Sequence, residues 1–204
     1  MLLGHSLQDL MAPGRCVACR RPGSLLCPQC ADSLARPRND GAVEGIDRTL
    51  AAWDYDGAAR TLILALKVGG RRAAAGPPAA AMCERARAVG IKAGVVTWVP
   101  GRRGDQRRRG FDHAEVLARL VAAGLGLPAR ALLRRRGPAR LDQTTLGASE
   151  RWINLHGAFI ARASPTPVLL VDDLVTTGAT ASSCAGALQA AGAPGVEALV
   201  ACRA

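Results

Sequence analysis

The sequence has no long uninterrupted apolar run, and this absence excludes one class of protein. No window approaches the eighteen or more consecutive apolar residues of a membrane-spanning helix, although 49% of the residues are hydrophobic. The opening residues, MLLGHSLQDLMAPGR, lack the basic segment of a secretion signal and place Asp9 where its apolar core would lie. We therefore expect a cytoplasmic protein, and its 204 residues suffice for one domain of ordinary size with a small appendage.

Lysine is also scarce, since only Lys67 and Lys92 occur and arginine carries most of the basic charge. The net charge of +11 is concentrated between residues 100 and 140, where there are eleven arginines and three acidic residues. Such a segment produces a local positive field that attracts phosphate, either on a small ligand or on nucleic acid. A solvated surface in an arginine-rich chain is the simpler alternative.

Four of the seven cysteines lie within the segment CVACRRPGSLLCPQC. They are Cys16, Cys19, Cys27 and Cys30. Two CxxC knuckles can bring four thiolates around one ion, which predicts a structural Zn²⁺ site with no open coordination position. Two disulfides and a single redox CxxC are the alternatives, but a cytoplasmic chain is kept reduced and a redox motif needs only one pair. The other three cysteines lie among apolar residues and are expected to be small buried hydrophobes.

The rest of the chain alternates between strand and helix patterns. Apolar residues at helical spacing predict helices over residues 57–67, 76–87, 111–123 and 180–191. Short runs of β-branched and aliphatic residues predict strands over residues 95–99, 168–171 and 196–200, with 131–133 as a further candidate. This alternation favours an α/β fold with a mainly parallel sheet covered on both faces. Proline, glycine and charge before residue 45 mark a boundary, so we expect a knuckle subdomain over residues 1–45 and a main domain over residues 46–204.

The segment VLLVDDLVTTGAT, residues 168–180, combines an apolar strand, two carboxylates and a turn rich in hydroxyl groups. In an open α/β sheet, ligands bind beyond the carboxyl ends of the strands, where helices begin. The amides and hydroxyls of the turn can surround a phosphate, whereas Asp172 and Asp173 can accept hydrogen bonds from ribose hydroxyls. The residue types therefore predict a ribose 5-phosphate site. An ordinary surface turn beside two acids is the alternative.

This segment resembles the signature with which type I phosphoribosyltransferases bind phosphoribosyl pyrophosphate (PRPP). Further matching motifs make nearly the whole chain similar to the ComF competence-protein family. They are the cysteine knuckles, LALK ending at Lys67, VP at residues 99–100, RRGF at residues 108–111, Gln143, Arg151 and Asn154. The resemblance implies a type I phosphoribosyltransferase-like domain with a small N-terminal zinc-binding subdomain built on the four knuckle cysteines. The sequence departs from the family's RGFNQA at Asp112 and His113, and it has one set of knuckles where some members have two.

The resemblance also implies roles for individual residues. Asp172 and Asp173 would hold the ribose hydroxyls. The loop that would hold the 5-phosphate consists of Thr176, Thr177, Gly178, Ala179 and Thr180. Arg102 or Arg103 would neutralise the departing pyrophosphate, and Lys67 is a weaker candidate for the same role.

A second group of roles concerns closure of the site and its cation. Gln143 and Arg151 would contact pyrophosphate from residues 134–151, which would act as a lid. Mg²⁺ would come with PRPP, bridging its pyrophosphate oxygens. His113 is either a base or simply a residue at the start of a helix.

The sequence is compatible with three functions. The first is a phosphoribosyltransferase with an unknown acceptor. The second is a DNA-uptake accessory that binds single-stranded DNA, or other competence proteins, through the arginine-rich segment. Its aromatic content counts against it, because binding of single strands usually adds base stacking and only Phe111 lies near these arginines. The third is a PRPP-responsive regulator without catalysis.

Overall fold

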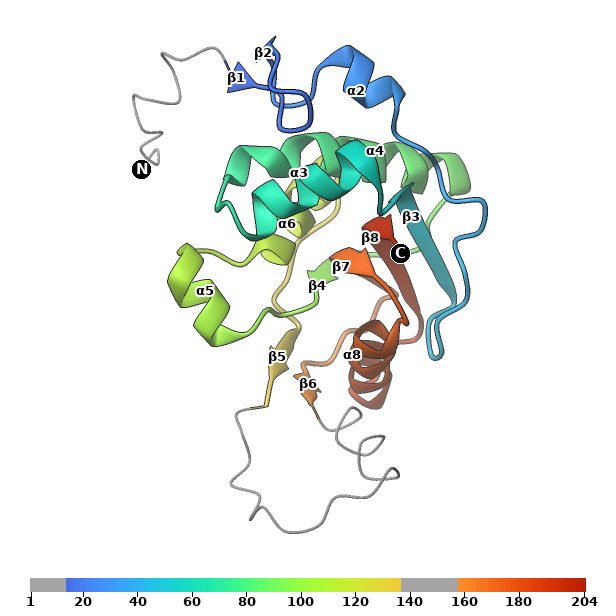
Figure 1. Ribbon diagram of the computed structural model, residues 1–204. Helices are drawn as coiled ribbons and strands as arrows, with labels where there is room; N and C mark the ends of the chain where they lie inside the picture. Colours follow the sequence, from blue (N-terminus) through green and yellow to red (C-terminus); the bar gives the residue numbers. More distant parts are fainter. Residues whose placement is uncertain (1–13, 137–157) are drawn as a thin grey trace.

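Four parallel strands form the central sheet of the computed structural model, which describes residues 14–136 and 158–204 (Figure 1). The strands occur in the order β3, β8, β7, β4. Their bounds are β3 Arg48–Asp54, β8 Val196–Arg203, β7 Val168–Val175 and β4 Val95–Trp98. Parallel pairing places Trp98, the last residue of β4, opposite Val171 in the middle of β7, so β7 continues past the end of β4. The predicted α/β architecture with a mainly parallel sheet is confirmed.

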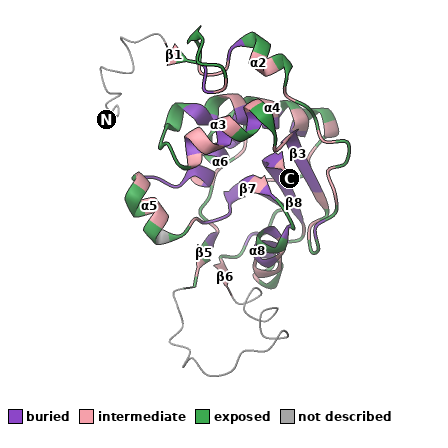
Figure 2. Ribbon diagram, in the orientation of Figure 1, coloured by how far each residue is buried: buried purple, intermediate pink, exposed green. Residues whose placement is uncertain are grey.

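Helices cover both faces of this sheet, as the layers of Figure 1 show. One face packs against α3 Gly57–Lys67, α4 Gly76–Val89 and α6 His113–Leu125. The other packs against α8 Ala179–Ala190 and the hairpin of β5 Leu133–Arg135 and β6 Phe159–Ala161. The central strands are buried throughout most of their length (Figure 2), which explains why β7 and β8 read as nearly continuous apolar runs.

Local signals define the helix ends. The side chain of Asp56 accepts a hydrogen bond from the Gly57 amide at the start of α3, and Asp112 accepts one from the Ala114 amide at the start of α6. Gly90 and Gly126 adopt left-handed conformations where α4 and α6 end. The four predicted helices are therefore present, each within two residues of its expected limits.

The structure also contains elements that the sequence patterns did not reveal. β3 has the sequence RTLAAWD, whose small residues give little strand signal, and its pairing with β8 imposes the conformation. Residues 103–109 form a short helix, α5 Arg103–Arg109, where a basic loop was expected. β5 begins two residues later than the candidate strand, and its partner β6 was not predicted. β7 continues to Val175, four residues beyond the predicted end.

The N-terminal described segment is small. It contains β1 Gly14–Arg15, β2 Pro22–Gly23 and α2 Pro28–Asp32, and a 3-10 turn, η1 Arg72–Ala75, precedes α4 further along the chain. Val17 is buried in the same apolar cluster as α3 and α4. Within the described ranges, none of the helices is long and apolar enough to cross a lipid bilayer.

Candidate functional site

The two adjacent aspartates lie inside the last half of β7, and their side chains have different environments. Asp173 is buried, with only 2% of its surface exposed, whereas Asp172 is partly exposed. The backbone amide of Asp173 donates to Oδ1 of Asp172 at 2.9 Å. Because β7 ends at Val175 and α8 begins at Ala179, both carboxylates lie at the carboxyl edge of the sheet, as expected for a ligand site.

Asp173 is held by two cationic or hydrogen-bonding partners from other elements. Nζ of Lys67, at the end of α3, lies 3.0 Å from Oδ1 and 2.9 Å from Oδ2 of Asp173. Nε2 of His113, at the start of α6, lies 3.4 Å from the same Oδ2. Burial raises the pKa of Asp173, but the nearby His113 and the charge of Lys67 outweigh it and hold the pKa below its ordinary value. Asp173 is therefore an ionised carboxylate that joins three elements.

Arg109 determines which nitrogen of His113 carries the proton. Nη1 of Arg109 lies 2.8 Å from Nδ1 of His113. A guanidinium can only donate, so Nδ1 must accept, and a neutral ring then carries its proton on Nε2, facing Asp173. Nη2 of Arg109 is also 3.6 Å from Oδ2 of Asp105, so the network extends from α5 to β7.

Asp172 has no cationic partner comparable to Lys67 within the described part of the chain. Burial raises the pKa of Asp172 well above its ordinary value, and the neighbouring charge of Asp173 raises it further. The pKa values of the two aspartates are thus shifted in opposite directions. Asp173 is ionised because of its partners, whereas Asp172 holds its proton more tightly. A hydroxyl-rich ligand that donates hydrogen bonds to Asp172 would favour its charged form.

The loop after β4 faces these carboxylates and is fixed by Asp112. Oδ2 of Asp112 accepts hydrogen bonds from the Gly101 amide at 2.9 Å and from Nε2 of Gln106 at 2.6 Å. Nε of Arg135 donates to the carbonyl of Pro100 at 2.9 Å. A Cβ on Gly101 would lie 3.3 Å from Asp112, so the absence of a side chain permits this close approach. Asp112, where the sequence departs from RGFNQA, therefore holds residues 100–101 in place.

The turn between β7 and α8 has the geometry expected for anion binding. Gly178 occupies the position before α8 with φ of +79° and has no side chain to cap the helix. The hydroxyl of Thr177 accepts from the Ala179 amide at 3.4 Å, and Thr176, Thr177 and Thr180 are exposed. The first-turn amides of α8 and these hydroxyls can bind a phosphate.

Together these groups line a cavity of about 240 Å³ at the carboxyl ends of β4 and β7. Of the predicted residues, Lys67, Arg102, Asp172, Asp173 and Thr180 line it. The structure adds side chains that sequence reasoning had not assigned to the site: Asp105, Gln106, Arg109 and Arg135. Arg109 could have been suspected from its four-residue spacing to His113, but Arg135 comes from a strand placed only by the tertiary structure.

The remaining predicted residues have separate outcomes. Thr176, Thr177, Gly178 and Ala179 form the turn beside the cavity. Arg102 is exposed and precedes α5, whereas the side chain of Arg103 lies outside the described part of the structure. Gln143 and Arg151, and nearly all of the segment expected to act as a lid, also lie outside the described residues.

A second cluster contains the four knuckle cysteines. Their sulfurs all lie within 4.8 Å of one another, and the Sγ atoms of Cys19 and Cys27 are 3.6 Å apart. A tetrahedral zinc with Zn–S bonds of about 2.3 Å requires S–S separations of about 3.8 Å, far longer than the roughly 2 Å of a disulfide. Arg20 adopts φ of +65° and donates its amide to the Cys16 carbonyl at 2.9 Å, which forms the tight turn of the first knuckle. The donor set therefore fits Zn²⁺.

The thiols of this cluster differ in acidity. Although burial raises the pKa of Cys16, hydrogen bonds from the backbone of Cys19 and Cys27 outweigh it and lower the pKa to about 6. The pKa of Cys30 rises to about 12, chiefly through side-chain hydrogen bonds with Cys27 and Cys19. One thiolate is thus already favoured, which suits binding of a cation that four sulfurs share.

The acidic cluster in the first site does not form a comparable metal centre. One ligand atom from each of His113, Asp172 and Asp173 lies within 4.8 Å of the others. The ammonium of Lys67, however, already contacts both carboxylate oxygens of Asp173 and would repel a cation placed there. A divalent cation at this site would therefore depend on Asp172 and on oxygens brought by a ligand.

No protein-family model and no curated protein matches this sequence. Among solved structures, the allosteric regulatory enzyme of purine biosynthesis is similar at 20% identity and a TM-score of 0.45, over 62% of this chain and 26% of that one. Adenine phosphoribosyltransferase from Leishmania tarentolae is similar at 18% identity and a TM-score of 0.33, over 61% of this chain and 54% of that one. TM-scores below 0.5 establish no relationship, so the functional assignment rests on the chain's own site.

Proposed function

We propose that this chain is a ComF-like, PRPP-binding phosphoribosyltransferase that releases pyrophosphate. The main support for this proposal is the position of Asp172. It lies at the carboxyl end of a buried parallel strand, shortly before the hydroxyl-rich turn that begins α8. A partly exposed carboxylate beside an anion-binding turn suits a ribose 5-phosphate, whose diol and phosphate are a few ångströms apart. The cysteine cluster, which would hold a structural Zn²⁺, agrees with the same family resemblance.

Within this proposal, each described residue has a specific task. Asp172 accepts hydrogen bonds from the ribose diol, while Thr176, Thr177, Gly178, Ala179 and Thr180 surround the 5-phosphate. Asp173 acts indirectly, because Lys67 and His113 already occupy its carboxylate. Lys67 is therefore assigned to Asp173 and not to pyrophosphate, which revises its expected role.

The departing pyrophosphate would lie along the loop after β4. Gly101 and Arg102 belong to this loop, and Arg109 and Arg135 line the same cavity with their positive charges. Cation side chains fixed before reaction stabilise the charge that develops on a leaving group. Arg103, Gln143 and Arg151 remain proposed contacts on the basis of the resemblance. Mg²⁺ carried by PRPP would neutralise further pyrophosphate charge, with Asp172 as the protein carboxylate available to it.

Calorimetry with PRPP and Mg²⁺ tests the binding step. We expect the wild type to bind one PRPP per chain and Asp172→Ala to weaken binding about tenfold or more, because charge-assisted hydrogen bonds are lost. Glu84→Ala, an exposed acid on α4, is the matched control and should bind as the wild type does. Absence of PRPP binding in the wild type, or equal affinity in Asp172→Ala, would contradict the proposal.

Catalysis requires a separate assay, since a PRPP-responsive regulator would pass the binding test. Pyrophosphate release should be followed with candidate acceptors that carry a nucleophilic ring nitrogen, amine or phosphate. Release that depends on the acceptor and is lost in Asp172→Ala supports the transferase. Tight PRPP binding without acceptor-dependent release would favour the regulator instead.

Single-stranded DNA binding is the second candidate, and α5 is the observation that favours it. Arg102, Arg107 and Arg108 are exposed on or beside this helix, although Arg108 pairs with Asp105 at 2.6 Å. Neutralising phosphates with such residues gives a steep decrease of affinity with salt. Arg107→Gln with Arg108→Gln should reduce that slope, and the Arg60→Gln control on α3 should not. Affinity that is independent of salt would exclude this role.

A further inference from the structure

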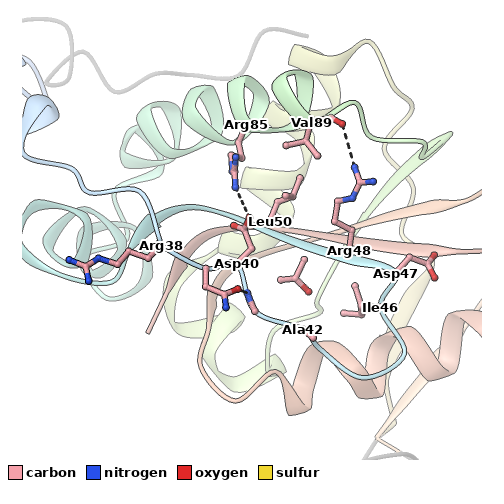
Figure 3. Close-up of a pocket in the computed structure, with 12 residues that line it drawn as sticks. Arg38, Asp40, Ala42, Ile46, Asp47, Arg48, Leu50, Arg85 and Val89 are labelled. Carbon is pink, nitrogen blue, oxygen red and sulfur yellow. Dashed lines mark hydrogen bonds and ion pairs between the residues drawn. The ribbon is translucent and has the colours of Figure 1, made fainter.

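A second hollow lies at the opposite end of the sheet from the candidate site. Residues 38–42 and 46–50, with Arg85 and Val89 of α4, line a cavity of about 540 Å³, which we call the β3 hollow (Figure 3). It is at the beginning of β3, whereas the candidate site is at the carboxyl ends of β4 and β7. Its volume is within the range typical of sites for small ligands, and it exceeds the 240 Å³ of the first cavity.

Asp40 fixes one wall of the β3 hollow. Its Oδ1 accepts from the Ala51 amide at 2.9 Å, and its Oδ2 lies 2.5 Å from Nη2 of Arg85. Its backbone carbonyl accepts from Nη1 of Arg203 at 2.6 Å. These three contacts tie the segment before β3 to α4 and to the last strand, so the hollow is formed before any ligand enters.

Two residues that line this hollow carry a buried polar atom without a hydrogen-bond partner. Among the described residues, only three buried side-chain nitrogen or oxygen atoms lack a hydrogen-bond partner. Two of them, Oγ1 of Thr49 and Nε of Arg85, belong to residues that line the β3 hollow, and the third is Oδ2 of Asp173, which has ion-pair contacts in the candidate site. Both atoms are shielded from solvent, so a ligand in the hollow would contact them only after the side chain of Thr49 or Arg85 turns towards it.

Arg48 is a partly exposed cation of the hollow. Arg48 is held loosely, because its Nη1 is 3.4 Å from the Val89 carbonyl and 3.9 Å from Oε1 of Glu197. In Figure 3, Arg48 and Arg85 stand on either side of Leu50, while Arg38 extends away from them. Two guanidinium groups flanking an apolar side chain form a surface suited to a ligand with both an anionic group and apolar atoms.

Carboxylates near the hollow reduce its positive charge. Asp40 is already neutralised by Arg85. Oδ2 of Asp47 accepts from the Val196 amide at 2.9 Å, and Oε2 of Glu197 accepts from the Lys92 amide at 2.8 Å. These hydrogen bonds orient Asp47 and Glu197 but leave their negative charges in place. The lining keeps a small positive excess, because Arg38, Arg48 and Arg85 stand against Asp40 and Asp47.

We propose that the β3 hollow is a second binding site, for a small ligand that carries an oxyanion. The oxyanion is held chiefly by Arg48, with the Arg85 side of the hollow contributing further donors, and apolar ligand atoms pack against Leu50 and Val89. Phosphate and carboxylate groups both fit this description. Comparing the affinities for the two anions shows which of them the hollow prefers. The site is independent of the proposed transferase function, because none of its lining residues lines the first cavity.

Amide NMR titrations of the full chain with inorganic phosphate and, separately, with malonate test this proposal. We expect saturating shifts for amides of residues 38–50 and 85–89 with at least one of the two anions. Arg48→Gln should weaken this binding about tenfold, because charge-assisted hydrogen bonds are lost while the Asp40–Arg85 pair remains. Arg60→Gln removes an exposed arginine outside the hollow and should leave the affinity unchanged.

The titration distinguishes this site from the candidate phosphate turn, whose amides at residues 176–180 report independently. Saturation at residues 38–50 that is weakened only in Arg48→Gln supports the β3 hollow, whatever happens at the turn. Non-saturating shifts with both anions, or the same affinity in Arg48→Gln as in the wild type, would overturn it. Saturation at the turn alone would also overturn it while leaving the proposed function intact.

Discussion

Lys67 and Asp173 are 106 residues apart in sequence, yet Nζ of Lys67 contacts both carboxylate oxygens of Asp173, at 3.0 and 2.9 Å. The contact joins the end of α3 to the middle of the site-forming strand β7. It converts the second acid of the VLLVDDLVTTGAT segment from a ligand candidate into a structural anion. The adjacent Asp172, which lines the cavity, has no such partner among the described residues.

Replacing Lys67 should lower the free energy of unfolding, because the buried carboxylate of Asp173 loses its cation. Lys67→Met leaves this carboxylate with His113 as its remaining partner among the described residues, and we expect a loss of about 1–3 kcal/mol in the free energy of unfolding, measured with urea. Adding Asp173→Asn should recover most of the loss. Lys92→Met, at the only other lysine, should change stability by less than about 0.5 kcal/mol. Equal effects of the two lysine variants would contradict this interpretation.

The raised pKa of Asp172 should make the wild type less stable as pH rises. A salt-bridged acid with a lowered pKa has the opposite effect. Its pKa in the folded state is raised above the ordinary value of 3.8, so the folded state binds the proton more tightly than the unfolded state. The free energy of unfolding therefore decreases as pH rises from 3.8 towards the raised pKa. Asp172→Asn lacks this loss and should be more stable than the wild type at pH 8, with a smaller difference at pH 4. A constant difference would contradict the raised pKa.

Thiol reactivity should divide the cysteines into two groups. Zinc-loaded protein should react slowly with an aromatic disulfide reagent, and chelation should release four thiols together with one zinc per chain. Cys83, Cys184 and Cys202 are buried, and burial raises their thiol pKa values, to about 12 for Cys202. These three should react only after denaturation. Zinc retained in Cys16→Ser at full stoichiometry and affinity would contradict the four-sulfur site.

Gly178 should be intolerant of a side chain for two reasons that can be separated. Its φ is +79°, and a Cβ would lie 2.7 Å from Cγ2 of Val43. Gly110 has a similar φ of +75°, but no atom of the described residues lies within 4 Å of its Cβ position. Gly110→Ala should cost about 1 kcal/mol for the backbone conformation alone, and Gly178→Ala about 2–4 kcal/mol. Val43→Ala should reduce the extra cost in the double variant. Equal losses of free energy of unfolding at the two glycines would show that the Val43 side chain moves aside without a measurable penalty.

Thr49 and Thr97 provide a matched pair for testing an unsatisfied hydroxyl. Both are buried, but Oγ1 of Thr49 has no hydrogen-bond partner in the described ranges, whereas Oγ1 of Thr97 accepts from the Leu132 amide at 3.2 Å. Thr49→Val should raise the free energy of unfolding by about 1 kcal/mol, and Thr97→Val should lower it by about the same amount. Destabilisation by Thr49→Val in ligand-free protein would show that the hydroxyl has a partner in the folded state.

Periodic and capped segments were predictable from the sequence. The helix Gly57–Lys67 was predicted with its observed bounds, because its apolar residues recur on one face and two glycines follow it. The structure adds the cap that Asp56 provides at its start. The strand at residues 168–171 was identified from its apolar run, and the ending of β7 was not, since a strand that continues through two acids has no local signal. α5 was missed for a related reason, because its arginine-rich sequence has no apolar face.

Contacts between distant segments required the tertiary structure. Nothing in the sequence pairs Lys67 with Asp173, or Arg109 with the His113 ring in a particular tautomer. The position of Arg135 in the cavity depends on the β5–β6 hairpin, which has only three residues in each strand. The β3 hollow depends in turn on how the segment before β3 crosses α4.

The sequence alone determined that an α/β sheet would place two aspartates and a hydroxyl-rich turn together, and that four cysteines would share one region. These features follow from residue type and short spacing, which act locally along the chain. The tertiary structure decided that Asp173 is held by Lys67 and His113 while Asp172 faces the cavity without such partners among the described residues, because burial and charge depend on neighbours brought in from α3 and α6. Electrostatic interactions act through space, so the charge state of each aspartate depends on which side chains the fold packs against it.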